Sequence, residues 1–316
     1  MSILASEAAL AHDISGQLSR GSSASSSSVD SSRVETVAVV SPGAMGSALA
    51  DALARGGVRV VATLAGRSER TARLAATAGR LELLPDLATV VREADVVLSI
   101  LPPEAAPLAA GEIAATASAR GASPLLVDLN AIAPTTARQI AEAGLELVDG
   151  SISGPPPWKP RTTRMYLSGR RAREVAALPF DGVDRIVVGD DVGAASAVKM
   201  STASVYKGTS AVLAHALLAA QANGVLEHVV ADLGAAAPEL VAGVERSLAI
   251  AATKAHRYVG EMHEIATTQE TAGLSPALFE AIAGIYATLA ETPLGCSGLE
   301  EVPADPRLED VLEGLR

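Results

Sequence analysis

Apolar and polar residues alternate along this chain in two ways, and the change between them falls near residue 190. From residue 36 to about 188, short runs rich in Val, Leu and Ile alternate with longer stretches whose apolar residues recur at helical spacing. Strands that alternate with helices are typical of a doubly wound parallel sheet. The pattern predicts strands at 36–40, 58–64, 95–100, 124–129, 145–148, 165–168 and 185–188. It predicts helices at 46–55, 68–78, 87–93, 104–120 and 134–143.

The strand pattern almost disappears from residue 192 onward. Residues 193–221 carry an Ala/Val/Leu stripe and predict one long helix, followed by helices at about 239–268 and 277–289. The predicted fold class is therefore α/β, a Rossmann doubly wound sheet (36–191) followed by an all-α C-terminal domain (192–316). Residues 1–35 contain a serine tract that cannot bury apolar surface, so we expect a flexible leader.

Composition narrows the class of protein. The net charge is −11 and no basic tract occurs, which argues against nucleic-acid binding. No apolar run reaches the length of a membrane span, and the N-terminus lacks the pattern of a secretory signal. Cys296 is the one cysteine, so an internal disulfide framework is excluded. We expect a cytoplasmic protein that contacts neither membrane nor nucleic acid.

The most informative motif lies between the first predicted strand and the first helix. It reads Ser41, Pro42, Gly43, Ala44, Met45 and Gly46. The dinucleotide fingerprint G-x-G-x-x-G would have glycine at position 41, whereas Gly43 and Gly46 are in place. Free N–H groups at a helix N-terminus suit a phosphate, so the turn predicts a pyrophosphate site. An ordinary strand–turn–helix is the alternative.

The end of the second predicted strand bears on which dinucleotide would bind. An NAD site usually has an acidic residue there for the ribose 2′-hydroxyl, and this chain has none. Arg67, Ser68 and Arg70 instead supply cations and a hydroxyl for a 2′-phosphate. The alternative is a solvated turn in which Ser68 caps the next helix. We predict NADP(H) over NAD(H).

Three further strand ends carry candidate site residues. Leu101 and Pro102 follow the third predicted strand and Asn130 follows the next, where a dinucleotide-binding domain places its ribose and nicotinamide. Residues 149–158 form a Gly/Ser/Pro-rich loop that presents Ser151, Ser153 and the Gly154 backbone. Small residues let hydroxyl and N–H groups converge on an anion such as a carboxylate. An ordinary turn is the other interpretation of this loop.

The predicted long helix contains Lys199 in an otherwise small and apolar run. Its side chain either reaches the surface or faces the carboxyl edge of the sheet, where desolvation would lower its pKa. Ala203 and Tyr206 fall on about the same helix face, and Lys207 is close by.

The later predicted helix at 239–268 also carries candidate residues. Arg257 either pairs with Glu261 at i+4 or meets a substrate carboxylate. His256 and His263 share a helix face, but no third ligand is evident, so we predict no metal site.

Taken in order, these features resemble the β-hydroxyacid dehydrogenase superfamily, which includes 6-phosphogluconate and 3-hydroxyisobutyrate dehydrogenases and, more distantly, imine reductases. The resemblance spans about 36–290. It consists of the turn at 43–46, the loop at 99–102, residues 149–154 against the family's D-x-x-x-S-G loop, and a glycine-led helix with Lys199. The C-terminal half resembles a poorly characterised branch of that family. Thr202 and Ala203 replace two asparagines that orient substrate in the main family.

The resemblance implies an NADPH-dependent oxidoreductase that transfers hydride to the carbonyl carbon of a small acid. Lys199 would exchange a proton with the carbonyl oxygen. Ser153 and the Gly154 N–H would hold the acid group, with Asn130 and Trp158 nearby, and Tyr206 or Lys207 would replace the missing asparagines. It also implies a homodimer through the C-terminal helices. An imine reductase of secondary metabolism and a non-catalytic NADP-binding protein are the alternatives.

Overall fold

The computed structural model describes residues 34–158 and 162–316, so most of the predicted leader lies outside the described residues. The chain divides into two compact units, one that ends at Met200 and one that begins at Ser201 and runs to Arg316. We call them the sheet unit and the helical unit. The division falls inside a long helix, α8 (Ala194–Ala222), which contributes residues to both.

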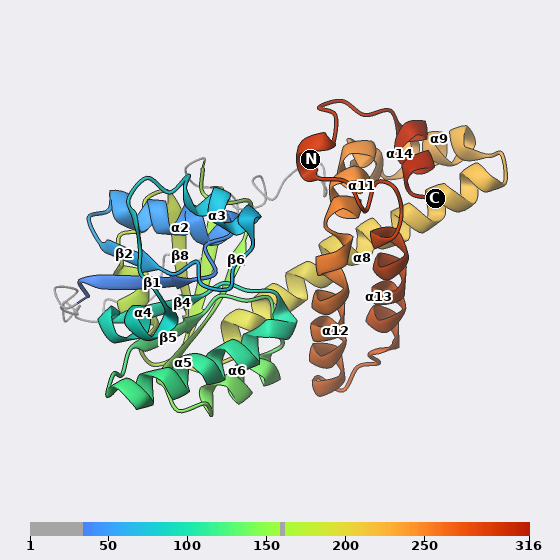
Figure 1. Cartoon of the computed structure of the whole chain (residues 1–316). Helices are drawn as coiled ribbons and strands as arrows, with labels where there is room; N and C mark the ends of the chain where they lie inside the picture. The colour runs from blue at the N-terminus through green and yellow to red at the C-terminus, as the bar shows by residue number, and fades with distance from the viewer. Residues whose placement is uncertain (1–33, 159–161) are drawn as a thin grey trace, which may run out of the picture. The chain divides into compact units, whose positions relative to one another are not determined.

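The sheet unit is built on one eight-stranded sheet with the order β3-β2-β1-β4-β5-β6-β7-β8 (Figure 1). The strands are β1 (Thr36–Val40), β2 (Arg59–Ala62), β3 (Leu81–Leu83), β4 (Val96–Ser99), β5 (Leu125–Asp128), β6 (Leu147–Ser153), β7 (Thr163–Ser168) and β8 (Val183–Gly189). Neighbouring strands are parallel except β6 and β7, which are antiparallel. The first six strands follow the Rossmann order, which confirms the predicted fold class.

Helices cover both faces of the sheet, which explains why its central strands are continuously apolar. The helices are α2 (Ala44–Arg55), α3 (Glu69–Ala75), α4 (Leu87–Glu93), α5 (Ala106–Arg120), α6 (Pro134–Ala141) and α7 (Ala172–Ala177). Successive side chains of β1 point to opposite faces. Val37 and Val39 join a core with Leu49 of α2, whereas Ala38 joins a second core with Ile113 of α5.

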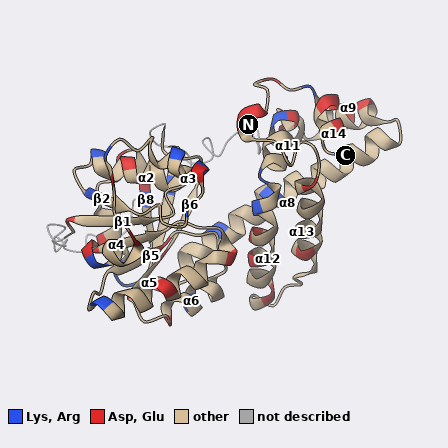
Figure 2. Ribbon diagram, viewed as in Figure 1, with Lys and Arg blue, Asp and Glu red and all other residues tan. Residues whose placement is uncertain are grey.

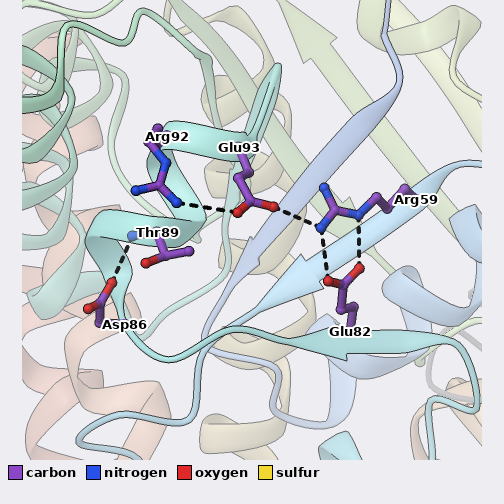
Figure 3. A network of polar contacts seen from close by, with 6 residues as sticks. All are labelled: Arg59, Glu82, Asp86, Thr89, Arg92 and Glu93. Carbon is purple, nitrogen blue, oxygen red and sulfur yellow. Dashed lines mark hydrogen bonds and ion pairs between the residues drawn. The ribbon is translucent and has the colours of Figure 1, made fainter.

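The edge strand β3 was missed by the sequence analysis. It is only three residues long, too short for an alternating pattern to register. Arg59 of β2 holds it through two hydrogen bonds to Glu82, at 2.8 and 2.9 Å, and also bonds Glu93 of α4 at 2.8 Å (Figure 3). In the same region the Asp86 carboxylate accepts the Thr89 N–H at 2.7 Å and caps α4.

The helical unit contains only helices among its described residues, as predicted. After α8 come α9 (Leu226–Ala236), α10 (Pro238–Val241), α11 (Val244–Thr253), α12 (Ala255–Thr271), α13 (Ala277–Ala290) and α14 (Leu308–Gly314). The single helix predicted at 239–268 is wrong. α10 ends at Val241, Gly243 at φ +70° is the N-cap of α11, and a turn at Lys254 separates α11 from α12. Periodicity alone misses such breaks because the apolar spacing continues across them.

Charged residues lie mainly on the helices and loops, and β1 and β4 carry none (Figure 2). Within the described ranges, no helix combines the length and the apolar character that crossing a membrane requires.

Candidate functional site

The turn between β1 and α2 is pinned by short hydrogen bonds. The Gly43 N–H donates to the Ser41 carbonyl at 2.8 Å, and the buried Ser47 hydroxyl donates to the Pro42 carbonyl at 2.6 Å. Gly43 caps α2 without any side-chain hydrogen bond, and the first turn of α2 carries no acidic residue. The N–H groups of Ala44 and Met45, at the start of α2, are therefore available to an anion.

The two glycines of the turn have different roles. A Cβ at Gly46 would lie 2.7 Å from the Ser41 carbonyl oxygen and 3.2 Å from Val39, so only glycine fits between helix and strand. A Cβ at Gly43 would meet nothing within 4 Å, so the space in front of this backbone is open. These are the roles that the dinucleotide fingerprint gives its second and third glycines.

The turn also lies where a doubly wound sheet binds ligands. β1 pairs with β2 on one side and β4 on the other, so the strand order reverses between β1 and β4. Val40 and Ser99 are register partners, which places the turn at 41–46 beside the loop that contains Leu101 and Pro102. The predicted cofactor residues of these two segments therefore lie next to each other at the point where the strand order reverses.

The segment after β2 presents two exposed cations. Arg67 and Arg70 are exposed, and neither forms an ion pair with any described residue. The Ser68 hydroxyl accepts the Thr71 N–H at 3.2 Å and caps α3. Glu69, the nearest acid, has a 97% exposed side chain and lies 3.9 Å from Arg73. No described carboxylate therefore takes the position of a ribose ligand at the end of β2.

Asn130 is buried in a polar cluster that ties two strand-end loops together. Its side-chain N–H groups donate to Asp128 at 2.8 Å and to the Ser99 hydroxyl at 3.1 Å, and its oxygen accepts the Leu101 N–H. Its backbone N–H donates to Asp128 at 3.0 Å. Asn130 is 2% exposed, so in this structure it fixes the loop of Leu101 rather than offering its amide to a ligand.

Asp128, which the sequence analysis did not single out, is fully buried. Burial raises the pKa of its carboxyl to about 7, with a further contribution from the neighbouring Asp149, while the hydrogen bonds from Asn130 and Ser99 oppose the rise. An aspartate that ends an otherwise apolar buried strand is the sequence feature that could have pointed to it.

A second buried carboxylate, Asp149 of β6, caps the start of α8. It accepts the N–H groups of Gly193 and Ser196 at 2.9 and 3.0 Å, the Ser196 hydroxyl at 2.6 Å and the Ser168 hydroxyl at 2.9 Å. A negative charge at a helix N-terminus is stabilising. Asp149 therefore docks the first turn of α8 on the sheet.

The predicted loop at 149–158 is corrected in its first half. Asp149 to Ser153 continue β6 and pair with β7. Small residues such as Gly150 and Ser151, which suggested an exposed loop, instead fit a buried position in the sheet. Ser151 is fully buried and its hydroxyl donates to the Ala195 carbonyl at 2.8 Å, which gives it a structural role under α8 in place of the predicted contact with substrate.

The end of β6 retains the other predicted substrate residues. Ser153 is 8% exposed, and Gly154 has φ +100°, a conformation that glycine adopts most readily. A Cβ at Gly154 would lie 2.1 Å from the Thr162 carbonyl, so the chain passes closely here. Trp158 is 66% exposed. Ser153 and Gly154 thus come together, whereas Trp158 lies at the surface.

Lys199 lies one turn beyond the capped start of α8. Its Nζ donates to the Ile152 carbonyl at 2.9 Å, and its side chain is partly buried. Because β6 runs parallel to β5, Ile152 and Ser153 are at the carboxyl edge of the sheet. The structure therefore brings the amine of Lys199 to the same strand end as Ser153, as the second interpretation of this lysine expected.

Lys207 lies within the helical unit and is enclosed there. Its ammonium pairs with Glu261 of α12 and lies 4.2 Å from the ring centroid of Tyr258, while its carbonyl accepts the Tyr286 hydroxyl at 2.7 Å. The side chains of Lys207 and Glu261 are only 14% and 8% exposed. Lys207 is thus committed to the packing of three helices, and the predicted Arg257–Glu261 pair is replaced by this one.

The remaining predicted residues of the helical unit are spread over its surface and core. Ala203 is 4% exposed, Tyr206 is half-buried and Arg257 is exposed. Of these, Arg257 forms no ion pair with a described residue. No group of three or more His, Cys, Asp or Glu side chains within the described ranges could hold a metal ion.

A Rossmann-ordered sheet with an open glycine turn at its switch point, where a helix starts, is the arrangement of a dinucleotide-binding domain. Comparison with known proteins agrees. Residues 36–173 match the NAD binding domain of 6-phosphogluconate dehydrogenase, and residues 220–289 match a domain of unknown function, DUF1932.

Two solved structures and one curated protein are similar to the chain over much of its length. The conserved protein MTH1747, described as structurally similar to 3-hydroxyacid dehydrogenases, is 30% identical, with 81% of this chain and 97% of that chain covered and a TM-score of 0.61. A conserved hypothetical protein of Sinorhizobium meliloti 1021 is 27% identical over 90% of this chain and 97% of its own, with a TM-score of 0.63. A 28.5 kDa protein of Methanothermus fervidus is 28% identical over 174 residues, which are 54% of this chain and 66% of that protein.

The chain therefore belongs to the 3-hydroxyacid dehydrogenase-like family in which an NAD binding domain of the 6-phosphogluconate dehydrogenase type precedes a DUF1932 domain. This confirms the resemblance drawn from the sequence. The 3-hydroxyisobutyrate dehydrogenase of Mycobacterium tuberculosis, 22% identical with a TM-score of 0.61 over 90% of this chain and 99% of that chain, shares the fold.

Proposed function

We propose that this protein is an NADP(H)-dependent oxidoreductase that interconverts the carbonyl and hydroxyl forms of a small acid. The observation that carries the proposal is the position of Lys199, whose amine is fixed at the end of β6, at the carboxyl edge of the sheet that also carries the glycine turn. A proton donor at that edge is what hydride transfer to a carbonyl requires of the protein.

The residues present fit the dinucleotide. The open space at Gly43 and the N–H groups that follow it would hold the pyrophosphate, and Leu101 and Pro102 follow the neighbouring strand at the same edge of the sheet. Arg67 and Arg70 are exposed and pair with no described carboxylate, which favours a 2′-phosphate and hence NADP(H). When bound, the cofactor supplies or accepts the hydride.

The chain's own groups would supply position and one proton. Lys199 donates a proton to the carbonyl oxygen during reduction and accepts it during oxidation, while its hydrogen bond to Ile152 holds the amine in place. Ser153 and the Gly154 N–H hold the acid group of the substrate. Asp149 acts through α8, because it fixes the helix turn from which Lys199 extends.

Turnover of a ketoacid panel with NADPH, alongside a panel of cyclic imines, tests the proposal. We expect Lys199→Ala to lose about 10²–10⁴-fold in kcat while the Kd for NADPH stays unchanged. Lys199→Arg, which keeps a donor that does not deprotonate, is the matched variant and should also be slow. Wild-type turnover in Lys199→Ala would reject the role of the lysine, and activity confined to imines would favour an imine reductase.

Cofactor choice has its own test. We expect Arg67→Asp to lower the ratio of kcat/KM for NADPH to that for NADH, because it replaces a 2′-phosphate ligand with a repelling charge. An unchanged ratio would reject the preference. Binding of NADPH without turnover of any compound would instead support a non-catalytic NADP-binding protein.

We also propose a homodimer formed through the C-terminal helices. α9 and α10 carry Leu226, Val229, Val230, Leu233, Leu240 and Val241, and none of these side chains is buried within the single chain. Two adjacent helices without a buried residue gain their stabilisation by packing against another surface. A second copy of the chain is the partner that the family relationship favours.

A further inference from the structure

Ser41 has an unusual backbone conformation for a residue with a side chain. Twelve described glycines have φ between +64° and +157°, whereas Ser41, at φ +67°, is the one described residue of another type with a positive φ. A side chain in this left-handed conformation is strained, and glycine avoids the strain. The chain therefore keeps a serine where glycine would be more stable.

The surrounding contacts hold Ser41 in this conformation. Its carbonyl accepts the Gly43 N–H at 2.8 Å and faces Gly46, where any Cβ would lie 2.7 Å from that oxygen. The adjacent Pro42 carbonyl is held by the buried Ser47 hydroxyl. Relaxing φ at position 41 would move the carbonyl out of the space that Gly46 leaves for it.

The hydroxyl of Ser41 is not used to stabilise the turn. Ser41 is partly exposed, and its side chain forms no hydrogen bond with a described residue. It precedes the open space at Gly43 and the uncapped start of α2. Strained residues whose polar groups have no partner within the fold are a feature of ligand sites.

We propose that the Ser41 hydroxyl is a cofactor-binding group that donates a hydrogen bond to a phosphate oxygen of the bound dinucleotide. A glycine at this position offers only its backbone. The serine therefore lowers the stability of the free protein and raises its affinity for the dinucleotide. The inference rests on the proposed function, since it concerns the same cofactor. It assigns to Ser41 a role that the glycine of the fingerprint cannot perform.

Two substitutions separate the hydroxyl from the backbone strain. Ser41→Gly removes both, and Ser41→Ala removes the hydroxyl but keeps the strained Cβ. We expect both variants to bind NADPH about tenfold more weakly by calorimetric titration, because a hydrogen bond to a charged phosphate is lost. We expect the Tm of the free protein to rise in Ser41→Gly and to stay near the wild-type value in Ser41→Ala.

Gly121→Ser is the matched control. Gly121 has φ +64°, nearly the value of Ser41, and a Cβ there would meet nothing within 4 Å. It ends α5 before β5 begins, at the opposite edge of the sheet from the glycine turn. We expect this variant to lower the Tm without changing the Kd for NADPH.

Failure of the role of Ser41 can be distinguished from failure of the proposed function. If Ser41→Gly and Ser41→Ala bind NADPH as tightly as the wild type, the role of the hydroxyl is overturned while the proposed cofactor stands. If the wild-type protein binds neither NADPH nor NADH, the proposed function itself fails and the role of Ser41 fails with it.

Discussion

Asp128→Asn is the substitution whose effect the structure specifies most sharply. The Asp128 carboxyl is fully buried at the end of β5, and its pKa rises from an ordinary value of 3.8 to about 7. The folded chain therefore keeps this proton between pH 4 and pH 7, whereas the unfolded chain has lost it. Stability from this group is fully present below about pH 4 and is lost as the pH rises to about 7.

The size of the effect follows from the difference between the two pKa values. About three units at 1.36 kcal/mol each amount to on the order of 4 kcal/mol of unfolding free energy lost across that interval. An asparagine cannot ionise, so the variant should not show this loss. The new side-chain amide N–H also faces the N–H groups of Asn130, so one hydrogen bond is lost. This adds a destabilisation of about 1–3 kcal/mol that does not depend on pH.

The assay is urea unfolding of both proteins at pH 4.5, 6 and 8, followed by circular dichroism. Because the two units can unfold separately, the transition of the sheet unit is the one compared. We expect the stability of Asp128→Asn relative to the wild type to improve by about 3 kcal/mol from pH 4.5 to pH 8, because about 2.5 of the three units lie above pH 4.5. A difference in unfolding free energy that stays constant over this pH range would refute the raised pKa of Asp128.

Three further predictions concern other parts of the molecule. Asp86→Asn should show the opposite pH dependence, since the Thr89 N–H lowers the pKa of Asp86. The variant should be less stable than the wild type at pH 7, and the two unfolding free energies should converge below pH 4. A stability difference that persists at low pH would contradict this. Lys207→Met should cost about 3–5 kcal/mol because it leaves Glu261 buried and unpaired, and Lys207→Met/Glu261→Leu should recover part of that loss in urea unfolding. Leu233→Glu on α9 should shift the mass measured by light scattering from dimer to monomer. Glu227→Lys, at an exposed position of the same helix, is the control and should leave the mass unchanged. A monomeric wild type would contradict the dimer proposal.

The elements that could be predicted from the sequence are those whose pattern is local. β1 begins and ends where predicted because its buried residues form a continuous run. α4 begins where predicted because Asp86 caps it, and it ends where predicted, before the extended Ala94. β3 has three residues and is held by its pairing with β2, whose Arg59 bonds Glu82 across 23 positions of the chain. The long predicted helix at 239–268 failed because a glycine that permits φ +70° is also tolerated inside a helix.

The candidate site divides in the same way. Gly43, Gly46 and Lys199 belong to short motifs, so their positions at the sheet edge followed from the strand that precedes them or the helix that contains them. Which polar groups remain for a ligand depends on partners far along the chain. Ser151 is separated by 44 positions from the carbonyl it binds, and Lys207 by 54 positions from Glu261. Sequence alone marks these residues as polar within an apolar surrounding, and such a residue is equally suited to bind a ligand or to join two elements of the fold. Only the contacts decide: among the predicted site residues, the side chains of Ser41, Ser153, Arg67 and Arg70 form no hydrogen bond or ion pair with a described residue.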